Sequence, residues 1–244
     1  MTNADGTFNK KAVEKIVDAL AALLKSGRDV VLVTCGAIPL GVAKLKLRCY
    51  PSDMKVKQAA SSVGQGLLMS FYDKAFGRHG ITVGQLLLTK YTNQRDDTLT
   101  NASNTLGALL DHGAIPIINQ NDPIITDEIV LGDNDALSAY VANMVEADLL
   151  IFLTNTDGLY DRDPQLPDAK IIREVTVITD EIKAGAGGTS SPRSTGGMAT
   201  KLAAAVVASR SRTKTIIMNG ANPSKIINAL KGEQVGTYFE FNVQ

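Results

Sequence analysis

The sequence lacks the features of a disulfide-rich, secreted or membrane-spanning protein. Only two cysteines occur in 244 residues, Cys35 and Cys49, and their spacing fits neither a metal site nor a disulfide framework. A reducing, cytoplasmic location is therefore expected. The longest apolar stretches span about six residues, far fewer than the ~20 of a membrane helix. The N-terminal letters MTNADGTFNKK lack the apolar core of a signal peptide.

The chain also has no net charge and no run of basic residues. It contains 25 basic and 25 acidic residues, so composition gives no support for nucleic-acid binding. Its two histidines, His79 and His112, lie in no recognisable motif, and His112 before Gly113 is typical of a helix C-terminus. No side chain is expected to act as a metal ligand.

Helical and strand patterns alternate along the chain, whose length suits one large α/β domain or two small ones. Strands that are continuous apolar runs are buried on both faces, and their alternation with helices indicates a mainly parallel sheet covered on both sides. Spacing and apolar runs predict helices at 13–24, 55–76, 99–110, from 135 onward and at 200–209, and strands at 30–34, 81–89, 115–119, 149–154 and 215–218.

Polar residues follow three of the predicted strands. In open α/β sheets, ligands bind beyond the carboxyl ends of the strands. The polar segments are CGA at 35–37, QND at 120–122 and NTDG at 155–158. A further polar segment, DND at 133–135, precedes a helical pattern and could simply cap that helix, because Asp and Asn are preferred N-caps. The four segments together favour a polar ligand site.

The only long Gly/Ser-rich segment, EIKAGAGGTSSPRSTGG at 181–197, is predicted to be a mobile loop, and such loops are often functional. Its final Gly196-Gly197 leads into a helix with Lys201 in the first turns. A cation there opposes the helix dipole, whereas a bound phosphate would compensate it. No GxxxxGK[ST] occurs, which excludes a P-loop.

Eight motifs resemble those of the glutamate 5-kinases (gamma-glutamyl kinases) of the amino acid kinase family. They cover the chain from about residue 14 to its end, and GDND combined with GGMATK is specific. In chain order the motifs are VTCGAIPLG, QAASSVGQGLLM, VGQLLLT, NASNTLGALLDHGAIPIINQND, EIVLGDNDALSAYVA, ADLLIFLTNTDGLYDRDP, STGGMATKLAAA and VGTYFE.

The resemblance implies phosphorylation of the γ-carboxylate of L-glutamate by ATP with Mg²⁺, giving L-glutamyl 5-phosphate in the first step of proline biosynthesis. It also implies a single α/β domain, a three-layer αβα sandwich with a mainly parallel central sheet. Residues 1–148 would form its glutamate-binding half and residues 149–244 its ATP-binding half. The family's opening strand, with its KxGxS motif, and a C-terminal PUA domain are not expected in this chain.

This chemistry suits the composition. A carboxylate nucleophile is already ionised at neutral pH, so no general base is required. Phosphoryl transfer depends mainly on positioning and on neutralising charge at the transferring oxygens. Lysines, Mg²⁺ and backbone amides exposed by glycine can supply both.

Matching the motifs residue by residue implies the site. Asp122 and Asn134 resemble the glutamate-binding positions, where an acid would hold the ammonium and an amide would bind a carboxylate. Asp135 resembles the aspartate that organises the transferring groups, and Lys201 the lysine that neutralises the phosphates. The other expected substrate-binding residues are Cys35, Gly36, Ala37 and Asp133. The expected ATP-binding residues are Thr154, Asn155, Gly158, Tyr160, Ser194, Thr195, Gly196, Gly197, Met198, Ala199, Thr200 and Lys201.

Three substitutions depart from the family pattern: Cys35 and Asn155 replace the usual serine and aspartate, and Ser194 replaces a glycine. A catalytically impaired regulatory or assembly subunit, or a truncated form, is therefore an alternative. Acetylglutamate kinase, aspartokinase and uridylate kinase are alternatives within the family. The resemblance also implies a homo-oligomer, either a dimer or a tetramer, and feedback inhibition by proline.

Overall fold

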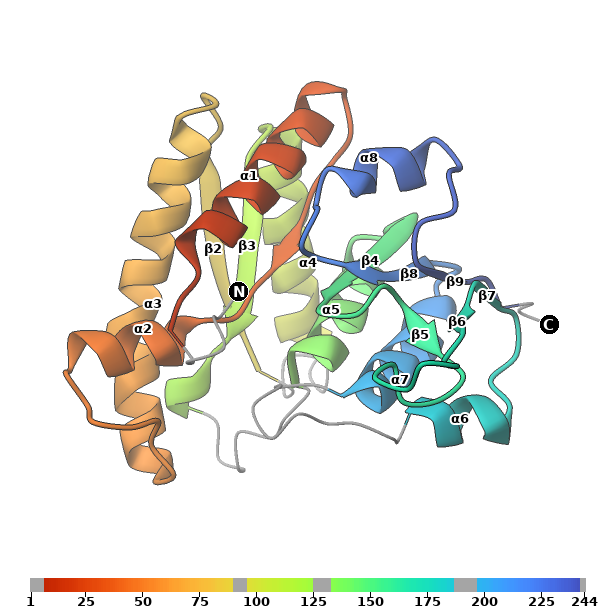
Figure 1. Cartoon of the computed structure of the whole chain (residues 1–244). Helices are drawn as coiled ribbons and strands as arrows, with labels where there is room; N and C mark the ends of the chain where they lie inside the picture. The colour runs from red at the N-terminus through yellow and green to blue at the C-terminus, as the bar shows by residue number, and fades with distance from the viewer. Residues whose placement is uncertain (1–6, 90–95, 125–132, 187–196, 242–244) are drawn as a thin grey trace. The chain divides into compact units, whose positions relative to one another are not determined.

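The computed structural model describes residues 7–89, 96–124, 133–186 and 197–241, and the chain forms two compact units, Met1–Val130 and Leu131–Gln244 (Figure 1). This boundary lies earlier than the division at residue 148 that the resemblance suggests. The difference arises because α5 (Asp133–Met144) packs against α7 and β4, which both belong to the second unit.

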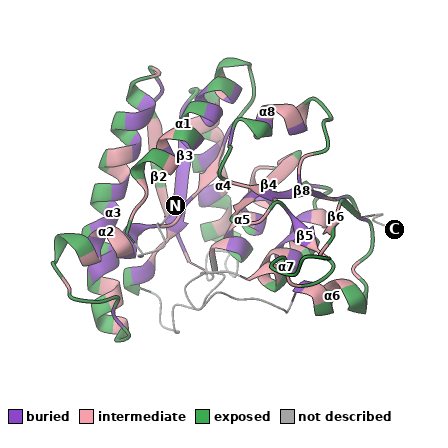
Figure 2. Cartoon of the chain, viewed as in Figure 1, coloured by how far each residue is buried: buried purple, intermediate pink, exposed green. Residues whose placement is uncertain are grey.

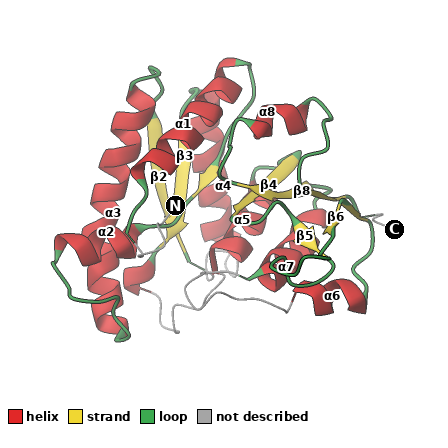
Figure 3. Cartoon of the chain, in the orientation of Figure 1, coloured by secondary structure: helices red, strands yellow, loops and turns green. Residues whose placement is uncertain are grey.

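The first unit is a parallel sheet with helices around it (Figure 3). Its strands lie in the order β1-β3-β2, and Ile117 of β3 is opposite Leu32 of β1 on one side and Gln85 of β2 on the other. The described elements are α1 (Lys10–Lys25), β1 (Leu32–Val33), α2 (Ala37–Lys44), α3 (Met54–Gly77), β2 (Val83–Leu88), α4 (Asp96–Asp111), β3 (Ile115–Gln120) and the 3₁₀ helix η2 (Asp122–Ile124).

The central strand β3 is buried along its length, as Figure 2 shows. Ile115, Ile117 and Ile118 have no exposed surface. In Figure 1, α1 lies on the near side of this sheet and α4, which packs against β3, lies on the far side. A strand covered on both faces needs apolar side chains on both, which explains its continuous apolar sequence.

Two glycines let α2 pack directly on the backbone of α3. A Cβ on Gly41 would overlap the carbonyl oxygen of Ala60, and a Cβ on Gly64 would overlap that of Ala37. The contacts are reciprocal, one glycine on each helix. They therefore fix the position of the first turns of α2, which is separated from the end of β1 by three residues.

The second unit has a four-stranded sheet in the order β4-β8-β9-β7 and a small antiparallel pair, β5-β6. Strands β4 and β8 are parallel, as are β7 and β9, whereas β8 and β9 are antiparallel. Besides α5, its described elements are β4 (Leu149–Thr154), β5 (Leu159–Tyr160), β6 (Ile171–Ile172), β7 (Glu174–Val175), α6 (Asp180–Ala186), α7 (Met198–Ser209), β8 (Lys214–Asn219), α8 (Lys225–Leu230) and β9 (Thr237–Phe239).

Helices α5 and α7 pack against each other and against β4 and β8 respectively. Leu202 and Ala205 of α7 share one core with Phe152, Ile217 and Phe239 from three strands. This core supports the first turns of α5 and α7. None of the described helices combines the length and apolarity that a membrane span requires.

The mainly parallel α/β architecture is confirmed: the described sheet of the first unit is wholly parallel, whereas that of the second unit is mixed, with its longest pairing, β4 with β8, parallel. The five predicted helices and four of the five predicted strands are confirmed to within a few residues. The strand predicted at 30–34 is only two residues long, although the amide of Thr34 still donates to Ile118 O at 2.8 Å.

The loop predicted at 181–197 is wrong in its first part, because residues up to Ala186 belong to α6. Thr179 begins this helix: its hydroxyl accepts the amide of Ile182 at 3.3 Å, and the acids Asp180 and Glu181 lie in the first turn. Residues 187–196 lie outside the described part of the chain.

Candidate active site

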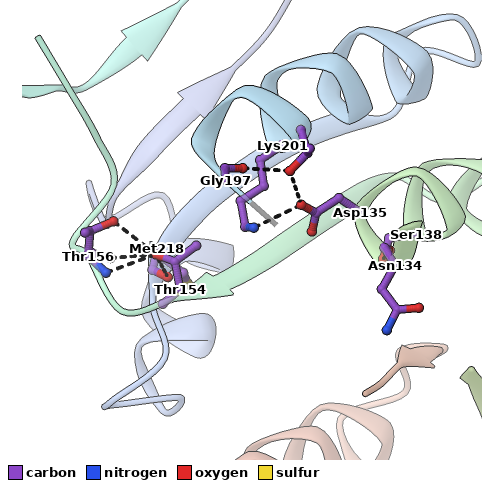
Figure 4. Close-up of polar contacts among 9 residues, drawn as sticks. Asn134, Asp135, Ser138, Thr154, Thr156, Gly197, Lys201 and Met218 are labelled. Atoms are coloured by element: carbon purple, nitrogen blue, oxygen red, sulfur yellow. Dashed lines mark hydrogen bonds and ion pairs between the residues drawn. The ribbon is translucent and has the colours of Figure 1, made fainter. Parts of the chain in front are cut away.

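The first turns of α5 and α7 bring together a carboxylate, an ammonium and a hydroxyl (Figure 4). Lys201 Nζ lies 3.0 Å from Asp135 Oδ2, and Thr200 Oγ1 lies 2.6 Å from the same oxygen. The side chains of Lys201 and Asp135 are only 13% and 12% exposed. Of the expected site residues, the structure thus brings Asp135, Gly197, Thr200 and Lys201 together.

Thr200 adds a second hydrogen-bonding group to the ion pair. Its hydroxyl lies within hydrogen-bonding distance of both Asp135 Oδ2 and the carbonyl oxygen of Gly197, at 2.6 and 2.7 Å. A buried ion pair is tolerated only when its remaining hydrogen-bonding capacity is satisfied. The ring of Phe152, whose centroid is 5.9 Å from Lys201 Nζ, lines one side of the ammonium. The lysine is therefore held in one place.

The arrangement positions a cation at the start of α7 rather than at its end. Gly197 precedes the helix in an extended conformation and has no side-chain cap, and Met198 and Ala199 form its first turn. Amide groups at a helix N-terminus and a neighbouring ammonium both attract an anion. This is the electrostatic environment that a phosphate group requires.

The loop after β4 is tied to the end of the parallel strand β8. Asn219 Nδ2 donates to Asp157 Oδ1 at 2.9 Å, and Thr154 Oγ1 donates to the carbonyl oxygen of Thr156 at 2.7 Å. Asn155 between them is exposed, whereas Gly158 is buried. A Cβ on Gly158 would lie 2.6 Å from Thr237 Oγ1, so the loop can pack there only with glycine. Tyr160 lies further on, in β5.

In the first unit, β1 and β3 end at the same edge of their sheet because they are parallel neighbours. Cys35 follows β1 and is half-buried, and Gly36 has a φ of 108° and caps α2. Ala37 is the first residue of α2. A left-handed conformation is open to glycine and costly for most other residues. Asp122, which begins η2 after β3, is 6% exposed.

A row of polar side chains on α3 contacts this edge of the sheet. Ser61 Oγ donates to Asp122 Oδ2 at 2.5 Å. One turn further along α3, Gln65 Oε1 accepts Asn119 Nδ2 at 2.9 Å. Two turns beyond that, the hydroxyl of Tyr72 lies 2.6 Å from Thr34 Oγ1. These three bonds join α3 to the ends of β1 and β3, and we call them the α3 polar row.

Two tyrosines near this edge have altered ionisation. Burial raises the pKa of Tyr72 well above its ordinary value, opposed by the hydrogen bond from Thr34 and helped by the charge of Cys35. Burial also raises the pKa of Tyr50, with further increases from the charges of Asp122 and Cys35. Both phenols therefore stay neutral at physiological pH, and Tyr50 lies within electrostatic reach of two expected substrate-binding residues.

Other expected site residues stay untested by these contacts. Figure 4 shows Asn134 turned away from Lys201 while Asp135 points toward it. The side chain of Asp133 and the residues Ser194, Thr195 and Gly196 lie outside the described part of the chain.

Sequence reasoning missed Ser61, Gln65 and Tyr72, although their positions are regular. Spacings of four and seven residues place all three on one face of a helix. Polar side chains on that face could have been noticed as a buried polar stripe, because Leu68 on the same face is apolar and fully buried.

No group of three or more His, Cys, Asp or Glu that could hold a metal ion occurs among the described residues. Mg²⁺ does not need such a group, because phosphate oxygens of a nucleotide and water usually provide most of its ligands, with one or two carboxylates. Asp135 is a buried carboxylate bonded to the first turn of α7 through Thr200.

Comparison with known proteins gives the class of this site. The model of the amino acid kinase family matches residues 2–219. The chain belongs to the amino acid kinase family.

Its relatives specify the branch of the family. It is 45% identical over 240 residues to a glutamate 5-kinase of Clostridium acetobutylicum, covering 98% of this chain and 90% of the relative. A glutamate 5-kinase of Listeria monocytogenes is also 45% identical, covering 96% of this chain and 87% of the relative. These similarities place the sequence among the glutamate 5-kinases.

Solved structures share the fold at low sequence identity. A carbamate kinase from Giardia lamblia bound to AMP-PNP superposes with a TM-score of 0.71 at 18% identity, over 99% of this chain and 95% of that one. An isopentenyl phosphate kinase from T. acidophilum gives a TM-score of 0.62 at 20% identity, over 95% and 91% of the two chains. Both agree with the α/β architecture described above.

Proposed function

We propose that the chain transfers the γ-phosphoryl group of ATP to the γ-carboxylate of L-glutamate, the first step of proline biosynthesis. The observation that carries this proposal is the enclosed group of Asp135, Thr200 and Lys201 at the start of α7. It occurs in a chain 45% identical to glutamate 5-kinases over almost its whole length. A cation fixed beside helix amides is what a transferring phosphoryl group needs.

The reaction needs no proton transfer. A γ-carboxylate oxygen of glutamate forms a bond to the γ-phosphorus of ATP while the bond to the bridging oxygen breaks, and ADP leaves. The products are L-glutamyl 5-phosphate and ADP. Because the nucleophile is ionised at neutral pH, catalysis consists of positioning and charge neutralisation.

Lys201 supplies a positive charge. Its stabilising effect becomes stronger as negative charge spreads over the phosphoryl oxygens. Asp135 and Thr200 hold the lysine so that it does not have to reorganise during the reaction, which is how preorganised groups lower a barrier. The amides at the start of α7, from Gly197 onward, would bind phosphate oxygens. Mg²⁺ brought with ATP would neutralise part of the phosphate charge, and Asp135 is the carboxylate here that would help to hold it.

Glutamate would be held by both of its charged ends. Asp122 is suited to its α-ammonium, because a buried carboxylate gains most from a cationic partner. The amide of Asn134 can donate to a carboxylate, and the start of α2, at Cys35, Gly36 and Ala37, offers backbone amides to another. Residues 154–160 would complete the nucleotide site through Thr154, Asn155, Gly158 and Tyr160.

We also propose a cytoplasmic homo-oligomer, dimeric or tetrameric, that is inhibited by proline. The similarity to glutamate 5-kinases supports this, and gel filtration and inhibition by proline would test it. A catalytically impaired relative is the competing function, since Cys35 and Asn155 depart from the family pattern. The intact ion pair between Lys201 and Asp135 favours the active enzyme.

The test is ATP turnover with Mg²⁺, in which hydroxylamine traps any acyl phosphate as a hydroxamate. L-glutamate, L-aspartate and N-acetyl-L-glutamate would be supplied in parallel. Hydroxamate from glutamate alone, abolished in Lys201→Ala, is expected. Product only from another acceptor would assign a different kinase of the family, and no product from any would favour the impaired relative.

A further inference from the structure

Ser61 is not among the expected site residues, but it forms a hydrogen bond with one of them, Asp122. Ser61, on α3, donates its hydroxyl to Asp122 Oδ2 at 2.5 Å. Both residues are almost completely buried, at 2% and 6% exposure. The bond connects α3 to the start of η2, and these two elements pack directly against each other. Its direction is fixed, because an ionised carboxylate can only accept.

The next bond along the α3 polar row supports the same part of the chain. The side-chain oxygen of Asn119 accepts the amide of Gln120 at 2.9 Å, which orients the Asn119 amide so that its Nδ2 donates to Gln65. Gln65 is one helical turn from Ser61. Asn119 near the end of β3 and Asp122 just after it are thus both held by one face of α3. The backbone that carries Asp122 has little freedom.

Backbone position alone does not orient a carboxylate. The terminal torsion of an aspartate is broad, so its two oxygens can turn over a wide range unless a partner holds one of them. Ser61 is such a partner: it is short, buried and on a rigid helix. A carboxylate held in one rotation offers a substrate cation an acceptor in a fixed place, at no ordering cost on binding.

We propose that Ser61 is a positioning residue for binding of the amino-acid substrate: its hydroxyl sets the rotation of the Asp122 carboxylate and thereby the affinity for the α-ammonium group. The proposal rests on the proposed function, in which Asp122 binds that ammonium. Ser61 itself touches neither substrate nor ATP in this role. Its loss should weaken glutamate binding and leave the phosphoryl-transfer machinery of the second unit intact.

The test compares Ser61→Ala with a neighbouring serine on the same helix. Ser62 Oγ donates to the carbonyl oxygen of Gln58 at 2.9 Å on the exposed side of α3, so Ser62→Ala removes an equivalent hydroxyl without reaching Asp122. Calorimetry with L-glutamate gives the Kd without turnover, and the hydroxamate assay gives kcat and both KM values. Circular dichroism and thermal unfolding show whether each variant is folded.

Ser61→Ala should raise the Kd and KM for glutamate about tenfold, the loss typical of a hydrogen bond to a charged group. The KM for ATP and kcat should change by less than twofold, and Ser61→Thr, which keeps the hydroxyl, should restore much of the affinity. Ser62→Ala should match the wild type. An unchanged glutamate Kd in a folded Ser61→Ala variant would overturn the proposal, as would equal increases in the KM values for glutamate and ATP.

A double-mutant cycle identifies Asp122 as the intermediary. In an Asp122→Asn background, Ser61→Ala should add less than twofold to the glutamate Kd, because the carboxylate it orients is already gone. A full tenfold addition there would show that Ser61 acts on another group, and the positioning role would be wrong.

The two proposals fail in different ways. Wild-type chain that binds glutamate but forms no hydroxamate would contradict the proposed function alone. Wild-type chain that forms hydroxamate, with Ser61→Ala indistinguishable from it, would contradict the positioning role alone. Wild-type chain that does not bind glutamate would contradict both.

Discussion

Lys201 Nζ and Asp135 Oδ2 lie 3.0 Å apart with both side chains largely buried. Enclosure makes the pair costly to break, because either partner alone would leave a charge without compensation. It also keeps water from screening the lysine. The same contact therefore governs both stability and charge neutralisation, and the two effects can be measured separately.

Replacing Lys201 with Met removes the cation and keeps most of the side-chain volume. We expect kcat to fall about 100- to 1,000-fold, the range for loss of one preorganised group that stabilises charge. Unfolding should be easier by about 3–5 kcal/mol, because Asp135 stays buried. Urea unfolding and the hydroxamate assay measure these effects. Lys183→Met, which breaks only an exposed pair with Asp180, is the control, and equal losses in both variants would refute the prediction.

Gly64 and Gly66 lie on the same helix and should respond in opposite directions to alanine. A Cβ on Gly64 would overlap the backbone of α2, whereas one on Gly66 would meet nothing within 4 Å. Gly64→Ala should lower the free energy of unfolding by about 3 kcal/mol or more through overpacking. Gly66→Ala should raise it by about 0.5–1 kcal/mol, because alanine favours a helix. Urea titrations of both variants measure this difference, and a change of the same sign in both would contradict the prediction.

Tyr72 makes the free energy of unfolding depend on pH in the alkaline range. Its pKa is raised in the folded chain above the ordinary 10.0, mainly by burial. The stability contributed by its neutral form is complete below pH 10 and is lost as the pH rises toward the folded-state pKa, because the unfolded chain ionises first.

Tyr72→Phe cannot ionise and loses its bond to Thr34. At pH 7 the free energy of unfolding of this variant should be about 1 kcal/mol lower than that of the wild type. Above pH 10 it should fall less steeply with pH than that of the wild type. Urea unfolding between pH 7 and 11 measures both quantities. Tyr140→Phe, at an exposed tyrosine on α5, should leave the alkaline slope unchanged. Parallel curves for Tyr72→Phe and wild type would contradict the assignment to Tyr72.

Cys35→Ser should strengthen glutamate binding, because a hydroxyl is a better hydrogen-bonding group than a thiol. We expect the glutamate KM to fall about threefold to tenfold, the range of a neutral hydrogen bond, with little change in the KM for ATP. The hydroxamate assay measures both. Cys49→Ser, at the exposed second cysteine, serves as the control. A raised glutamate KM would mean that the thiol contributes packing rather than hydrogen bonding.

Long elements could be predicted from sequence because their periodicity is local. The apolar run of β3 and the helical spacing of α1 both report burial directly. Two-residue strands such as β6 and β7 carry no such signal. They exist because a distant segment offers backbone partners, as Phe239 in β9 does for Val175. Helix α6 was missed because glycines obscured a short helix that Thr179 caps.

The candidate site likewise contains contacts that local sequence patterns could not predict. Asp135 and Lys201 are 66 positions apart, and only the resemblance to known kinases connected them before their contact was seen. Ser61 was absent from the prediction because a polar residue on a helix usually faces solvent. Its spacing from Leu68 and Tyr72 could have indicated a buried face, but its partner Asp122 lies 61 positions away, and no local pattern reveals that contact.

Each unit is one uninterrupted stretch of chain, and this has a consequence for biosynthesis. Among the described residues, the strand pairings of the first sheet all join residues that precede Val130. The ribosome therefore delivers β1, β2 and β3 before it begins the second unit. At about 5–20 residues per second, residues 131–244 take roughly ten seconds to emerge, which is long compared with the folding time of a small domain. The described sheet of the first unit can thus be assembled while the unit that carries Lys201 is still being made.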